Sequence, residues 1–81
     1  MKLDQKKERI LRVLAEDYEL NPGTYISGIS AMTIGIRIGT RPPMDVIGDL
    51  QALLLSGYIN RERFKWLING KSLSYLKTFR K

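Results

Sequence analysis

The side chains best suited to chemistry in this sequence are cations, and they gather toward its C-terminal end. Residues 1–60 hold seven Lys and Arg and seven Asp and Glu, whereas residues 61–81 hold seven cations and one carboxylate. The formal net charge of +6 therefore lies entirely in the last quarter of the 81-residue chain. Arginine forks donate paired hydrogen bonds to phosphate oxygens, and a one-sided cationic surface favours a polyanionic partner.

Other chemistry is excluded by composition. The sequence has no cysteine and no histidine, so it cannot form disulfides, zinc sites built from these ligands, or nucleophilic triads. Asp45 and Asp49 could transfer protons as a carboxylate pair, but two solvated helix charges are the more ordinary interpretation. We expect no enzymatic activity, no metal, no cofactor and no small-molecule substrate.

The length of the chain indicates one domain over residues 1–81, and its hydropathy indicates no membrane segment. The longest apolar stretch, Ala52–Leu55, is far shorter than the ~20 residues of a spanning helix. The first lysines alternate with Asp4 and Glu8, which is not the pattern of a signal peptide. We expect the protein to stay in the cytoplasm.

The first part of the chain predicts a helix and a short strand. A helix over about Asp4–Leu20 can be capped by Asp4 and ended by Asn21-Pro22-Gly23. Thr24–Ile26 is β-branched and aromatic, which predicts a short strand. The apolar stripe of the helix comprises Ile10, Val13, Leu14 and Tyr18, with Leu11 beside it.

Two further helices are predicted in the middle of the chain. Ser27 is the expected cap of a helix that ends near Ile38, and Gly39–Arg41 forms a tight turn. The third helix opens with Pro42 and Pro43 and runs to about Ser56, where Gly57 stops it. The inward-facing residues are Ala31, Ile34 and Ile38 in one helix and Val46, Ile47, Leu50, Leu53 and Leu54 in the other.

A hairpin and a last helix complete the pattern. Strands are predicted over Tyr58–Asn60 and Phe64–Ile68, with Arg61–Arg63 as the loop between them. Asn69 is the expected cap of a helix that ends near Phe79. Alternation places Phe64, Trp66 and Ile68 on one face of the second strand. The aromatic residues expected to pack over the helices are Tyr25, Tyr58, Phe64 and Trp66.

The order of these elements resembles that of winged helix-turn-helix domains. In that family a recurring pattern marks the point where the recognition helix runs into the wing. Two leucines are separated by two residues, a glycine follows after three more residues, and an isoleucine comes two positions after the glycine. Within Val46–Ile59 this pattern is matched by Leu50, Leu53, Gly57 and Ile59. Trp66–Asn69, followed by a helix, is similar to the family's return strand and last helix. The chain looks most like the small winged-helix regulators of archaea and their viruses.

The resemblance implies an α+β, mainly α fold. Its parts would be three helices, a small three-stranded antiparallel sheet with a wing hairpin, and a C-terminal helix. It also implies a small transcription regulator that binds double-stranded DNA. The third helix would face the major groove and the wing would lie on the backbone or minor groove.

The resemblance assigns DNA contacts to three groups of residues, which we expect on a common side of the fold. The wing would use Arg61, Arg63 and Lys65. The third helix and the turn before it would use Arg37, Thr40, Arg41, Met44, Asp45, Gly48 and Gln51. The C-terminal helix would place Lys71, Lys77 and Lys81 on the DNA backbone.

A second function competes with DNA binding. The outer face of the third helix has no cation, Asp45 and Asp49 repel phosphate, and Gly48 and Ala52 make a smooth surface for another helix. The alternative is therefore a winged-helix protein–protein adaptor that binds DNA weakly and without sequence preference. RNA binding is less favoured, because the aromatic residues are expected in the core. Three apolar residues are more than one small core is expected to bury, which favours a homodimer: Ile29, Ile36 and Leu55.

Overall fold

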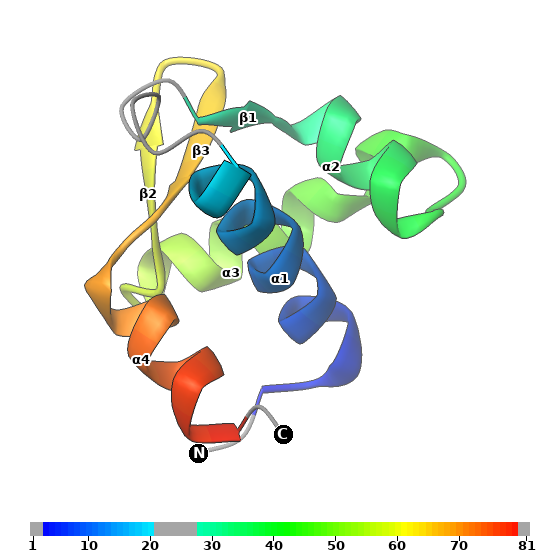
Figure 1. Cartoon of the computed structure of the whole chain (residues 1–81). Coiled ribbons are helices and arrows are strands. Elements are labelled where there is room, and N and C mark those ends of the chain that lie inside the picture. Colours follow the sequence, from blue (N-terminus) through cyan, green and yellow to red (C-terminus); the bar gives the residue numbers. More distant parts are fainter. Residues whose placement is uncertain (1–2, 21–27, 80–81) are drawn as a thin grey trace.

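Helices form most of the computed structural model, which describes residues 3–20 and 28–79 (Figure 1). The elements are α1 (Gln5–Leu20), β1 (Ile29–Ser30), α2 (Ala31–Ile38), the 3-10 helix η2 (Pro43–Val46), α3 (Ile47–Leu55), β2 (Ile59–Glu62), β3 (Lys65–Ile68) and α4 (Gly70–Phe79). This is the predicted mainly helical α+β class, with a three-stranded antiparallel sheet. Among the described residues, no helix is both long enough and apolar enough to cross a membrane.

Helix α1 lies at the centre of the packing and contacts α2, α3, β3 and α4. Its predicted cap is confirmed, because the Lys7 backbone N–H donates to Asp4 Oδ1 at 2.9 Å. The predicted turn Asn21-Pro22-Gly23 and strand Thr24–Ile26 lie outside the described residues, as does the side chain of Tyr18. The apolar stripe is otherwise confirmed, since the residues buried on α1 are Ile10, Leu11, Val13, Leu14 and Ala15.

The predicted start of the second helix is wrong. Helix α2 begins at Ala31, and its cap is Ser30, whose Oγ accepts from the Thr33 N–H at 3.3 Å. The residue before Ser30 belongs to a strand, because Ile29 pairs with Trp66 and is 7% exposed. Ile29 is therefore a core residue and does not remain surplus. Sheet pairing with a distant part of the chain overrides the local helix signal.

Strand β3 is the centre of the sheet, with β1 and β2 antiparallel on its two sides. The register pairs Ile59 with Ile68 at the base and Glu62 with Lys65 near the turn. The hairpin therefore turns on two residues, 63 and 64, rather than on the predicted loop over residues 61–63. Phe64 belongs to the turn and is 81% exposed, so its predicted place in the core is wrong. Trp66 is buried, as predicted.

The predicted end of α3 and start of α4 are confirmed. Gly57 ends α3 with a left-handed φ of 81°, and its N–H donates to the Leu54 carbonyl. Asn69 caps α4, because its Oδ1 accepts from the Ser72 N–H at 3.1 Å. Asn69 Nδ2 also donates to the Gly57 carbonyl at 2.9 Å. The start of α4 is thereby joined to the base of the hairpin (Figure 1).

Candidate nucleic-acid interface

Helix α2 lies so close to η2, the segment that leads into α3, that only glycine fits at residue 35. A Cβ on Gly35 would lie 2.7 Å from Pro43 Cα and closer still to the Pro43 carbonyl, so α2 and η2 approach backbone to backbone. Gly39 ends α2 with a φ of 81°, and its N–H donates to the Gly35 carbonyl at 3.0 Å. This close approach restricts how α2 can be oriented relative to η2.

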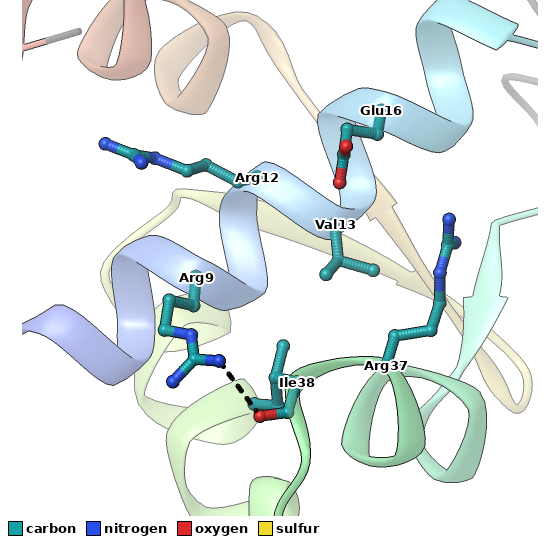
Figure 2. A pocket seen from close by; sticks show the side chains of 6 residues that line it. All are labelled: Arg9, Arg12, Val13, Glu16, Arg37 and Ile38. Atoms are coloured by element: carbon teal, nitrogen blue, oxygen red, sulfur yellow. Dashed lines mark hydrogen bonds between the residues drawn. The ribbon is translucent and has the colours of Figure 1, made fainter.

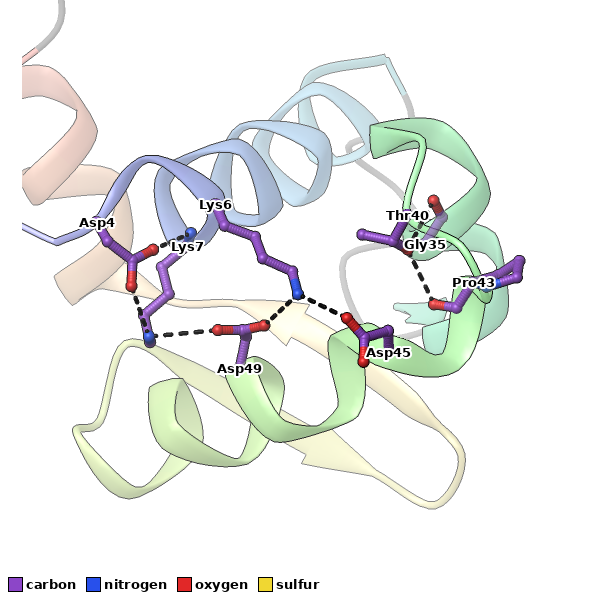
Figure 3. A network of polar contacts seen from close by, with 8 residues as sticks. All are labelled: Asp4, Lys6, Lys7, Gly35, Thr40, Pro43, Asp45 and Asp49. Carbon is purple, nitrogen blue, oxygen red and sulfur yellow. Dashed lines mark hydrogen bonds and ion pairs between the residues drawn. The ribbon is translucent and has the colours of Figure 1, made fainter.

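Thr40 holds this turn together. Its hydroxyl lies 3.2 Å from both the Gly35 and the Pro43 carbonyl oxygens, to either of which it can donate (Figure 3). Thr40 is half-buried, so the structure places this predicted DNA contact within the turn. Arg41, the next residue, is exposed at the start of the segment that leads into η2.

The acidic side chains at the start of the third helix are paired with lysines of α1 (Figure 3). Lys6 Nζ lies 3.2 Å from Asp45 Oδ2 and 2.9 Å from Asp49 Oδ2. Lys7 Nζ lies 3.3 Å from the other oxygen of Asp49 and 2.8 Å from Asp4 Oδ2. Asp49 therefore faces α1, and the carboxylates that would repel phosphate lie next to two ammonium groups.

The charged forms of these groups stabilise one another. The hydrogen bond to Asp49, and next that to Asp45, raises the pKa of Lys6. The hydrogen bond to Asp4 raises the pKa of Lys7, and the same bond lowers the pKa of Asp4. Solvent reaches this network and screens each pair, so it acts more on the local potential than on stability.

The outward side of η2 and α3 is smooth and nearly uncharged. Met44 is 45% exposed, Gln51 is exposed, and a Cβ added to Gly48 would meet nothing within 4 Å. Leu55 closes this surface at the end of α3 with 89% exposure. A flat object can therefore approach the α3 backbone closely at Gly48.

The cations of the hairpin share an end but not a face. Arg61 lies opposite Trp66 in the register, and its guanidinium is 5.2 Å from the centre of that ring. Lys65 lies opposite Glu62, so it belongs to the other face of the hairpin. Arg63 is at the tip with a φ of 58°, and its carbonyl accepts from Arg61 Nε at 2.9 Å. All three side chains are exposed.

The lysines of α4 are not brought to the hairpin tip, so the expected common side is not formed. Lys71 is at the base of the hairpin, where its ammonium donates to the Ser56 carbonyl at 2.7 Å. The same ammonium lies 4.5 Å from the centre of the Tyr58 ring. Lys77 is exposed further along α4, and Lys81 lies outside the described residues. Lys71 thus helps to end α3.

Sequence reasoning missed a second group of cations. Arg9 and Arg12 of α1 lie with Arg37 of α2 around an open cleft (Figure 2). The spacing of Arg9 and Arg12, one helical turn apart on the exposed side of α1, was the available signal. Arg37, predicted beside the third helix, belongs to this cleft.

The described residues contain no group of three or more Asp or Glu side chains that could hold a metal ion. Comparison with family models, curated proteins and solved structures found no significant match to the chain.

Proposed function

We propose that this protein is a winged helix-turn-helix domain that binds double-stranded DNA as a small transcription regulator. Helix α3 faces the major groove with its smooth outward side, and the β2–β3 hairpin is the wing. The element order and the sheet order β1-β3-β2 support the fold proposal, because they give the wing a third strand. The close approach of α2 to η2 supports the orientation of the reading helix.

The observation that carries the proposal is the backbone of Arg63. A left-handed φ of 58° costs an L-residue about 1 kcal/mol or more, and glycine adopts it freely. The tip nevertheless carries an exposed arginine. Backbone strain at an exposed cation supports a role for that cation in binding.

The two-faced arrangement of the hairpin cations favours entry into a groove over lying flat on the backbone. The minor groove is about 6 Å wide and is lined by phosphates on both walls. A hairpin that enters it end-on presents Arg61 to one wall and Lys65 to the other, with Arg63 leading. Phosphate contacts of this kind position the protein without reading sequence.

The pairing of Asp45 and Asp49 supports the approach of α3 to DNA. Unpaired carboxylates on this helix would repel the phosphates that line the major groove. Lys6 and Lys7 supply matching positive charge at distances of 2.9–3.3 Å. The base contacts available on this side are Met44 to a thymine methyl group and Gln51 to adenine.

Arg63→Gly tests the proposal because stability and binding should move in opposite directions. The variant relieves the left-handed strain, so the free energy of unfolding rises by up to about 1 kcal/mol. It also removes one phosphate contact, so the slope of log K against log salt becomes shallower by about 0.9. Urea unfolding and fluorescence anisotropy with a labelled 20-bp duplex measure the two effects.

Two variants control this experiment. Arg63→Gln removes the charge but keeps a side chain in the left-handed conformation, so it should weaken binding without the gain in stability. Lys77→Gln removes one charge from α4, which lies away from the hairpin tip, and should leave the salt slope unchanged, contrary to the assignment of Lys77 to the DNA backbone by resemblance. Equal salt slopes for Arg63→Gly and the parent chain would refute the wing assignment.

Exposed apolar side chains favour a homodimer, and they keep the adaptor function as the second candidate. Met32, Ile36 and Leu55 are 53%, 62% and 89% exposed on α2 and α3. As an adaptor, the protein would use Gly48 to admit a partner helix, and Gly48→Leu would abolish that complex. A normal complex with Gly48→Leu would argue against the adaptor.

A further inference from the structure

A cleft between α1 and the end of α2 gathers cations that the proposed DNA-binding surface does not use. It has a volume of about 250 Å³ and is lined by Arg9, Arg12, Val13, Glu16, Arg37 and Ile38 (Figure 2). The two aliphatic residues are buried, and the four charged side chains are exposed around them. Three arginines and a single carboxylate therefore line one hollow with an apolar floor, and their guanidinium groups point in different directions around it (Figure 2).

The guanidinium groups differ in how they are held. Arg9 Nη2 donates to the Ile38 carbonyl at 3.2 Å, which fixes this side chain across the end of α2. Among residues 3–20 and 28–79, Arg12 has only a long contact of 4.0 Å with Glu8. Within the part of the chain that the structure describes, the side chain of Arg37 makes neither a hydrogen bond nor an ion pair. As far as the described residues go, the cleft thus has one oriented fork and two forks with unused donors.

We propose that this cleft binds a phosphate group. Guanidinium forks match phosphate oxygens in shape and charge, so a phosphate in the hollow can draw the long, exposed side chains of Arg12 and Arg37 toward it. One water occupies about 30 Å³ of liquid, so the hollow also admits part of the molecule that carries the phosphate. Glu16 opposes the anion and limits its affinity. Every lining residue belongs to α1 or α2, so this proposal is independent of the hairpin.

The test follows the arginine side-chain Nε–Hε signals by NMR while inorganic phosphate is added at constant ionic strength. Saturable shifts with one dissociation constant are expected at Arg9, Arg12 and Arg37, while chloride produces none. Arg37→Gln should weaken phosphate binding about tenfold, because a charge-assisted hydrogen bond is lost. Glu16→Gln should strengthen it. Lys77→Gln is the charge-matched control and should bind phosphate as the parent chain does.

The opposite effects of Arg37→Gln and Glu16→Gln exclude a general loss of structure as the explanation. Linear shifts of equal size at all arginines, including those of the hairpin, would overturn the proposal. So would an Arg37→Gln variant with unchanged phosphate affinity.

A parallel titration with duplex DNA identifies the source of the phosphate. If Arg37→Gln binds duplex DNA as tightly as the parent chain does, the cleft is assigned to a small phosphorylated ligand. If the DNA affinity of Arg37→Gln falls by the same factor as its phosphate affinity, the cleft is assigned to the DNA backbone.

Discussion

Gly35→Ala should open the turn between α2 and α3. The new methyl group would meet the Pro43 backbone, which lies 2.7 Å from the Cβ position at its Cα and nearer at its carbonyl. Overpacking of this kind costs about 3 kcal/mol against rigid backbone, and alanine returns about 1 kcal/mol through its higher helix propensity. The net loss is about 2 kcal/mol, out of about 4–12 kcal/mol expected for a domain of this length.

Gly48→Ala is the matched control, because its Cβ would meet nothing within 4 Å. It should raise the free energy of unfolding by about 0.5 kcal/mol, since alanine is the better helix former. Urea unfolding followed by circular dichroism should therefore separate the two variants by about 2–3 kcal/mol. A Gly35→Ala variant as stable as Gly48→Ala would refute the backbone-to-backbone contact.

Three further perturbations test other parts of the structure. Asp45→Asn removes one carboxylate partner of Lys6 and raises the net charge by one, so affinity for duplex DNA should rise about threefold; an unchanged affinity in anisotropy titrations would count against α3 in the major groove. Tyr75→Phe removes the hydroxyl that accepts from the Leu3 N–H and donates to Glu8, at an expected cost of about 1–2 kcal/mol. Burial, and next the hydrogen bond to Glu8, raises the pKa of Tyr75. The contribution of the Tyr75 hydroxyl to the free energy of unfolding is therefore present below pH 10 and is lost as the pH rises further. The difference in free energy of unfolding between Tyr75→Phe and the parent chain, measured by urea unfolding, should shrink above pH 10. Leu55→Ser should shift sedimentation from dimer toward monomer, and an unchanged profile would remove Leu55 from the proposed dimer interface.

Local signals predicted the ends of several elements correctly. Asp4 and Asn69 cap their helices, and Gly57 ends α3, because each acts on backbone groups within a few residues. Ser27 and Ser30 carry the same capping signal three residues apart. The pairing of Ile29 with Trp66 makes Ser30 the cap, and no local rule contains that pairing.

The surroundings of the candidate DNA-binding residues depend on contacts between distant parts of the chain more strongly than the ends of the helices do. Asp45 is a phosphate-repelling residue in the sequence, but its partner Lys6 is 39 positions away. Thr40 looks like an exposed polar residue after a helix, yet the close approach at Gly35 turns its hydroxyl inward. Arg63 is an unexpected residue for a left-handed turn, so turn preferences favoured a longer loop and placed Phe64 in a strand.

The central claim about the hairpin and α3 is that this chain binds duplex DNA through phosphate contacts. Anisotropy titration of a random 20-bp duplex at 50 and 200 mM salt tests it most directly. Three hairpin contacts give a slope of about −2.7, which predicts an affinity about 40-fold or more lower at the higher salt. Binding that is absent at 50 mM salt, or equally strong at both concentrations, would contradict the claim.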